Sequence, residues 1–139
     1  MATVIRAEIS ERNKYWISKH RHYELKHFCL QYPIWKKKLQ ALNQLHIPTS
    51  KFETQHGSNI PNDIIAAQVI KRVRLIDKIE LIEKMALEAD EDLYEYILKA
   101  VTEGLSYTYL KTSMNIPCGR DMYYDRYRKF FWLLSEERD

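Results

Sequence analysis

Residues 93–134 read LYEYILKAVTEGLSYTYLKTSMNIPCGRDMYYDRYRKFFWLL, and this stretch decides the predicted fold. Apolar residues recur three and four positions apart on either side of residues 104–119, which is the period of α-helices. Gly104 predicts a helix stop, Ser106 a cap for the next helix, and Asn115 a tight turn with left-handed backbone. The order of these signals predicts a C-terminal group of three helices that contains a helix-turn-helix.

The last helix of this group, expected at about residues 119–135, has two unlike sides. Its apolar side contains Tyr127, Phe130, Phe131 and Leu134, together with Met122 or Tyr123. The opposite side contains Arg120, Asp121, Tyr124, Asp125 and Arg128. Ile116 is expected to fill the angle between this helix and the one before it. We therefore predict that the apolar side packs against the protein and that the polar side is exposed.

A helix divided in this way can enter the major groove of DNA, because its apolar side anchors it while polar side chains near its start reach the bases. We expect Arg120 to bind a guanine through two hydrogen bonds. Phosphates and sugars are expected to be contacted by Lys111, Tyr123, Tyr124, Arg126 and Arg128. Gly119 lies at the exposed start of this helix, where we expect free backbone amides to bind a phosphate. The predicted ligand is thus double-stranded DNA.

Outward from this stretch, the rest of the chain also reads as helical. Two helices are predicted at residues 10–32 and 33–46, followed by a polar loop at residues 46–61. Ser10 is the expected cap of the first helix, whose buried stripe is predicted to contain Trp16, His20, Tyr23, His27 and Leu30. A long helix at residues 62–88 follows, capped by Asn62, with an apolar seam of Ile65, Val69, Val73, Ile76, Ile79 and Ile82.

The predicted fold class is all-α, with an N-terminal helical pair, a long central helix and a C-terminal trihelical helix-turn-helix. The predicted boundaries are residues 1–61 for the pair and its loop, 62–89 for the connecting helix, and 90–139 for the DNA-binding unit. Composition favours helices over a turn-rich fold, because the 139 residues are 45% hydrophobic and include only three glycines and four prolines.

Charge is segregated along the chain. The net charge is only +3, but residues 11–38 carry eight cations and two anions, whereas residues 90–95 carry four carboxylates. Such segregation is expected when one face meets phosphates and another does not. The carboxylates at residues 90–95 are expected to cap a helix start rather than to form a catalytic site, because anions are stabilised there.

The sequence contains no signal peptide and no membrane span, so we expect a cytoplasmic protein with no membrane partner. Cys29 and Cys118 have no disulfide or metal spacing, and we expect free thiols. Cys118, beside Gly119 at a helix start, is a candidate for a lowered pKa. Because no nucleotide-binding loop, catalytic triad or zinc spacing is found in the sequence, we predict neither an enzyme nor a cofactor or metal.

The tail LSYTYLKTSMNIP at residues 105–117, followed by RDMYYDRYRKFF at residues 120–131, resembles the C-terminal helix-turn-helix of the RinA and ArpU group of phage late-gene transcriptional regulators. ELKHFCLQYPIWKKKLQAL at residues 24–42 is similar to that group's first helix, its Tyr-Pro break and the helix after it. The resemblance covers residues 24–137. It differs in the turn, where Pro117 and Cys118 replace a serine-led entry. The resemblance implies binding near a promoter and activation of late prophage genes, without a cofactor.

We therefore predict a sequence-specific DNA-binding transcriptional regulator, a phage or prophage late-gene activator, with RNA polymerase as a further candidate partner. A homo-oligomer, with a dimer favoured, is expected through the long helix or the N-terminal pair, since one recognition helix reads only a few base pairs. One alternative is a small terminase-type subunit that recognises a DNA-packaging site, for which a large ring is expected. The other is a helical protein–protein interaction module or inhibitor, which would not bind duplex DNA even at low salt.

Overall fold

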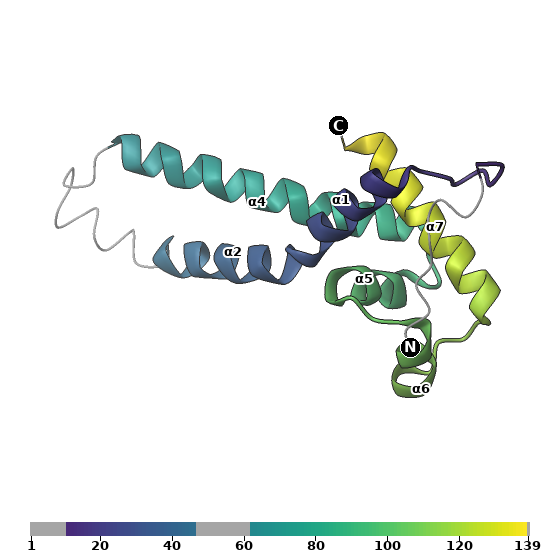
Figure 1. Ribbon diagram of the computed structural model, residues 1–139. Helices are drawn as coiled ribbons and strands as arrows, with labels where there is room; N and C mark the ends of the chain where they lie inside the picture. Colours follow the sequence, from purple (N-terminus) through teal and green to yellow (C-terminus); the bar gives the residue numbers. More distant parts are fainter. Residues whose placement is uncertain (1–10, 47–61, 139) are drawn as a thin grey trace. The chain divides into compact units, whose positions relative to one another are not determined.

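The computed structural model describes residues 11–46 and 62–138, and every regular element in these ranges is an α-helix. The helices are α1 (Lys19–Leu30), α2 (Tyr32–His46), α4 (Asn62–Ala89), α5 (Tyr94–Glu103), α6 (Tyr107–Met114) and α7 (Arg120–Glu137) (Figure 1). The predicted all-α class is therefore confirmed for this part of the chain. Ser10 and residues 47–61, expected as a cap and a loop, lie outside the described residues. None of the described helices is both long and apolar enough to cross a membrane.

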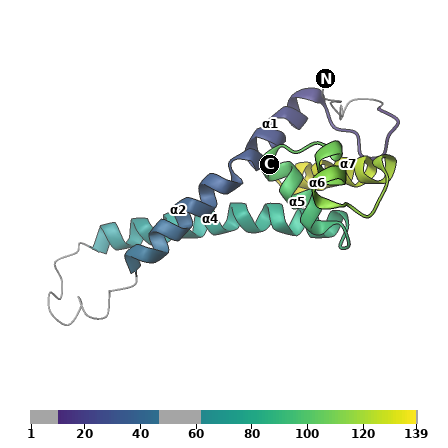
Figure 2. The same cartoon turned by 90° about the horizontal axis from the view of Figure 1, so that it is seen from below.

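The chain divides into two compact units. Unit 1 takes in Met1–Gln31 and Leu81–Asp139, so its described part contains α1, the end of α4, α5, α6 and α7. Unit 2 is Tyr32–Glu80 and contains α2 with the first part of α4. Figure 2 shows α5, α6 and α7 gathered together in unit 1. This division groups α1 with the C-terminal helices, whereas the predicted boundaries group it with α2.

The first helix begins later than predicted. Ser18 caps α1, and its side-chain oxygen accepts a hydrogen bond from the Arg21 N–H at 3.4 Å. Ahead of it, the Asn13 side chain accepts from the Tyr15 N–H at 2.8 Å, and the Asn13 carbonyl accepts from the Trp16 N–H at 3.0 Å. A side chain that hydrogen-bonds to the nearby backbone competes with helix formation. Residues 11–17 are therefore non-helical, and the predicted start is wrong.

The buried side of α1 also differs from the predicted stripe. His22, Leu25, Phe28 and Cys29 are buried, whereas His20, Tyr23 and His27 are exposed. The aromatic and aliphatic residues of α1 are distributed around its whole circumference, so the periodicity of its sequence allows more than one side to be buried. The contacts with α5 and α7 select the side that carries His22, whose ring lies 4.8 Å from that of Phe131.

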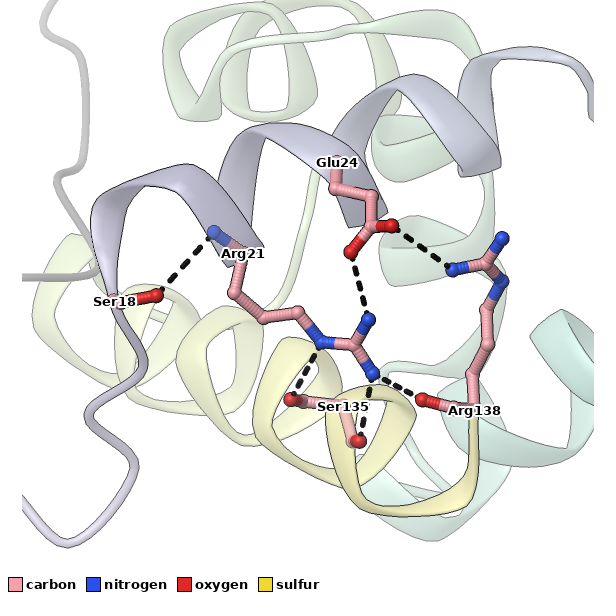
Figure 3. Close-up of polar contacts among 5 residues, drawn as sticks. All are labelled: Ser18, Arg21, Glu24, Ser135 and Arg138. Atoms are coloured by element: carbon pink, nitrogen blue, oxygen red, sulfur yellow. Dashed lines mark hydrogen bonds and ion pairs between the residues drawn. The ribbon is translucent and has the colours of Figure 1, made fainter.

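Arg21 ties the start of α1 to the end of α7 (Figure 3). Its Nε donates to Ser135 Oγ at 3.1 Å, and its Nη2 donates to the carbonyl oxygens of Ser135, at 3.0 Å, and of Arg138. A cation is favourable at these carbonyls because they form the negative end of the helix dipole. The hydrogen bond from Arg21 to Glu24, 2.7 Å long, keeps the pKa of that carboxyl below its ordinary value. The end of α7 is thus held by α1.

In unit 2, α2 begins at Tyr32 with Pro33 in its first turn, as predicted, and α4 begins at Asn62. Trp35 is buried, as are Leu75 and Ile79 of α4. In the view of Figure 1, α2 runs below the first part of α4. Among the described residues of unit 2, α2 is the one helix beside the first part of α4, and it covers one side of it. The predicted seam is consequently buried at Ile79 and Ile82 but exposed at Ile65, Val69 and Val73.

Candidate nucleic-acid interface

The connection from α5 to α6 forms as the sequence predicts. Ile97, Ala100 and Val101 on the apolar side of α5 are buried, as is Leu93, which directly precedes the helix. Gly104 ends α5 with a left-handed φ of 71°, which a side chain would strain. Ser106 then caps α6 by accepting a hydrogen bond from the Tyr109 N–H at 3.2 Å.

The turn between α6 and α7 also has the predicted conformation at its first two residues. Asn115 is left-handed, with φ 55° and ψ 46°, and its N–H donates to the Leu110 carbonyl. Ile116 is buried, and its N–H donates to the same carbonyl at 3.1 Å. The Tyr107 hydroxyl donates to the Cys118 carbonyl at 2.7 Å, which fixes the rest of the turn to the start of α6. These contacts hold the start of α7 in one place.

The first turn of α7 is exposed, as predicted for Arg120 and Asp121. Gly119 precedes it in an extended conformation and supplies no side-chain cap, so the first amides of the helix remain open for another acceptor. The Arg120 guanidinium carbon lies 5.2 Å from the centre of the Tyr107 ring. This contact positions a cation beside the open helix start.

Tyr123 and Tyr124 do not lie where the DNA-contact hypothesis requires. Their exposed fractions are only 1% and 8%, so the predicted contacts of both tyrosines with phosphates or sugars are wrong for this structure. Their rings lie 5.0 Å apart and both pack against Tyr107 of α6. Burial raises the pKa of Tyr123 far above that of an ordinary phenol. Of the two alternatives for the apolar side, Tyr123 is buried and Met122 is exposed, whereas Tyr124 is buried although it was expected on the opposite side, because α6 covers it as well.

Arg126 has a structural partner instead of an open position. Its Nε lies 2.9 Å from Asp90 Oδ2, and its Nη1 contacts the Asp125 carboxylate. Asp90 also accepts hydrogen bonds from the Asp92 and Leu93 amides, at 2.9 and 3.0 Å, and so caps the turn before α5. Arg128 is half-buried, and its Nε has no hydrogen-bond partner in the part of the chain that is described. Both arginines are thus less exposed than Arg120.

Replacing Asp90 by alanine is expected to lower the free energy of unfolding of unit 1 by about 1–3 kcal/mol, because a cap and a partly buried ion pair are lost together. Asp90→Asn retains an oxygen for the two amides and should lose less, so the difference reports the ion pair. Urea unfolding followed by circular dichroism measures both. Glu91→Ala, at the exposed neighbouring residue, is the control. A midpoint for Asp90→Ala equal to that of the control would contradict this role.

Lys111 is the other predicted contact that remains exposed. It lies in the last turn of α6, ahead of the turn that leads into α7, and its charge opposes the rise in the pKa of the Cys118 thiol. Tyr109 of α6, 44% exposed, was not predicted as a contact and adds an aromatic ring to the same helix. The candidate interface is therefore reduced to Lys111, Gly119 and Arg120, with Tyr109 as an addition.

Cys118 does not have the lowered pKa that its position suggested. Burial, and next the charge of Asp90, raise the pKa of this thiol, while Lys111 and Arg126 oppose the shift only in part. The thiol is consequently protonated at neutral pH and poorly nucleophilic. No group of three histidine, cysteine or acidic side chains in residues 11–46 and 62–138 is arranged to hold a metal ion.

Unit 2 contains a cationic surface that the charge pattern did not single out. A groove of about 450 Å³ is lined by Trp35, Lys38, Ala67, Ile70, Lys71, Arg74, Leu75 and Lys78. The lining includes four cations and no anion, and Lys78 Nζ lies 5.3 Å from the centre of the Trp35 ring. The available signal was the helical spacing of Lys71, Arg74 and Lys78. Such a surface attracts phosphates or carboxylates.

Comparisons of the chain with protein-family models, with curated proteins and with solved structures found no match.

Proposed function

We propose that this chain is a sequence-specific DNA-binding transcriptional regulator that reads duplex DNA with the first turn of α7. The observation that carries the proposal is the exposed start of α7, where Arg120 and uncapped amides follow a left-handed turn at Asn115. In this proposal α6 and α7 are the two helices of a helix-turn-helix. Arg120 reads a guanine, the amides bind a phosphate, and Lys111 binds the DNA backbone.

The contacts of α7 within unit 1 limit how the helix can meet DNA. It packs against α1, and Tyr123 and Tyr124 are buried. We therefore infer that only the tip of α7 enters the groove, as expected where the N-terminal residues of a recognition helix contact the bases. The resemblance to the RinA and ArpU group supports a role at late genes of a phage or prophage.

The test is a selection of bound sequences from random duplex DNA. Arg120→Ala is expected to weaken binding to the enriched sequence by about 1–3 kcal/mol and to relax preference at one base pair. Lys111→Ala should weaken all duplexes alike and reduce the slope of log affinity against log salt by about one unit. Lys84→Ala is the control, since that side chain is 66% exposed on α4 and remote in sequence from the turn.

Each outcome separates the hypotheses. An enriched motif that depends on Arg120 supports the regulator. A large ring that binds one packaging sequence would favour the terminase-type subunit instead. No duplex binding at low salt would overturn both and leave the protein-interaction module.

A further inference from the structure

The first part of α4 carries an apolar surface that is exposed among the described residues of unit 2, 32–46 and 62–80. Ile65, Val69 and Val73 are 42%, 47% and 50% exposed, and Ala66 beside them is exposed as well. Large aliphatic side chains gathered on one side of a helix are costly to leave in water. We therefore expect a binding partner to cover this surface.

We propose that two copies of this chain pair in parallel along α4, in a short two-stranded coiled coil. The central positions are Ala66, Val69, Val73 and Ile76, whose spacing of three, four and three residues is that of positions a and d in a heptad. Val73 takes an a position, where β-branched residues favour two strands. We name these four residues the α4 seam.

The side chains that flank the α4 seam in one copy complement those that flank it in a second copy. In a parallel pair, each g side chain meets the e side chain five residues further along the partner helix. Arg72 takes a g position and Asp77 an e position. The rule therefore places Arg72 opposite Asp77 of the partner subunit, a cation against an anion. It also places Ile65 opposite Ile70 of the partner subunit, so two exposed apolar side chains cover each other. Both flanking pairs match in one register.

Self-complementarity identifies a second copy as the occupant. The surface supplies both members of each flanking pair. A symmetric interface between two copies requires this, whereas an interface with a different protein does not. An antiparallel pair would set each g flank against another g flank and lose the contact between Arg72 and Asp77. The parallel arrangement is therefore the one that the charges favour.

The seam is short, and its ends are visible in the sequence. The next positions in the heptad are Asn62 before it and Glu80 after it, and neither supplies an apolar contact. A seam of this length stabilises a dimer only weakly, so association should depend on protein concentration. Lys71, Arg74 and Lys78 of the cationic groove fall at positions b and f, away from the α4 seam, whereas Ile70 of the same lining lies on the flank that the partner subunit covers.

The first test measures the mass of the full chain by analytical ultracentrifugation over a range of concentrations, without DNA, so it is independent of the proposed function. Val73→Asp is expected to raise the dimer dissociation constant by about 100-fold, because two unpaired charges would be buried. Ile64→Asp, on α4 but outside the seam and 50% exposed, should leave it unchanged. Unchanged helix content by circular dichroism shows that both variants are folded.

Two further variants test the pairing itself. Arg72→Asp should weaken the dimer, and Arg72→Asp with Asp77→Arg should restore it. Ala66→Cys and Ile76→Cys should each form a disulfide with its own copy under mild oxidation, since a parallel pair in register brings equal positions together. A chain that remains monomeric at the highest concentration reached, or a dimer that Val73→Asp does not weaken, overturns the proposal. Crosslinking only between Ala66→Cys and Ile76→Cys chains would overturn its parallel form.

Discussion

Phe131→Ala is expected to destabilise unit 1 by about 3–5 kcal/mol, because it removes a large, fully enclosed side chain and leaves a cavity. Phe131 is only 2% exposed. Its ring lies 4.8 Å from that of His22 in α1, and 4.9 and 5.0 Å from those of Tyr127 and Phe130 in α7. The substitution therefore acts on the contact between α1 and α7 as well as on α7 itself.

Urea unfolding followed by circular dichroism measures this loss. Phe131→Leu retains most of the volume and should lose substantially less. Met122→Ala is the matched control on the same helix, since Met122 is 46% exposed and its loss should change stability by less than about 0.5 kcal/mol. If Phe131→Ala and Met122→Ala unfold at the same urea concentration, α1 does not pack on α7 in the way described.

Stability of unit 1 is expected to fall steeply above about pH 10. Burial raises the pKa values of Cys29, Tyr123 and Tyr127 well above those of ordinary thiols and phenols. In the unfolded chain these groups lose their protons near their ordinary values, about 8.5 for cysteine and 10 for tyrosine. The unfolded state therefore binds fewer protons than the folded state at high pH. Each group contributes up to about 1.4 kcal/mol of destabilisation per pH unit until its folded-state pKa is reached.

The matched variant for this prediction is Tyr123→Phe. Its hydroxyl is buried and has no hydrogen-bond partner in residues 11–46 and 62–138, so stability at neutral pH should be retained. Above pH 10 the variant should lose stability less steeply, by about 1.4 kcal/mol per pH unit. Urea midpoints measured between pH 8 and pH 12 give the slope. An equal slope for the variant and the parent would show that Tyr123 ionises normally in the folded protein.

The proposed regulator and the proposed dimer have a common consequence. One α7 tip can contact only a few base pairs, and a parallel pair along α4 would supply two tips. Weak pairing through the short α4 seam makes DNA occupancy depend on protein concentration. If Val73→Asp abolishes the dimer but leaves Arg120-dependent binding to a single half-site, both proposals remain valid as separate properties.

Local signals in the sequence determined the helices and the connections in the C-terminal part. Gly104, Ser106 and Asn115 act through backbone and capping preferences that depend on few neighbours, and all three take the predicted conformations. The same holds for the start of α2, where Pro33 is compatible only with the first turn of a helix. The exposed positions of Arg120 and Lys111 also followed from helical periodicity.

For helices that carry aromatic residues on more than one side, only the tertiary structure decided which side is buried. Tyr124 was expected outside, and α1 was expected to bury the stripe that begins at Trp16; both were wrong because α6 and α7 supply rings that a periodicity count does not include. The partnership of Arg126 with Asp90 joins residues 36 positions apart, and no local rule reports it. Capping and turn preferences arise within a few residues, whereas burial depends on which helices meet, and that is set by the packing of the whole unit.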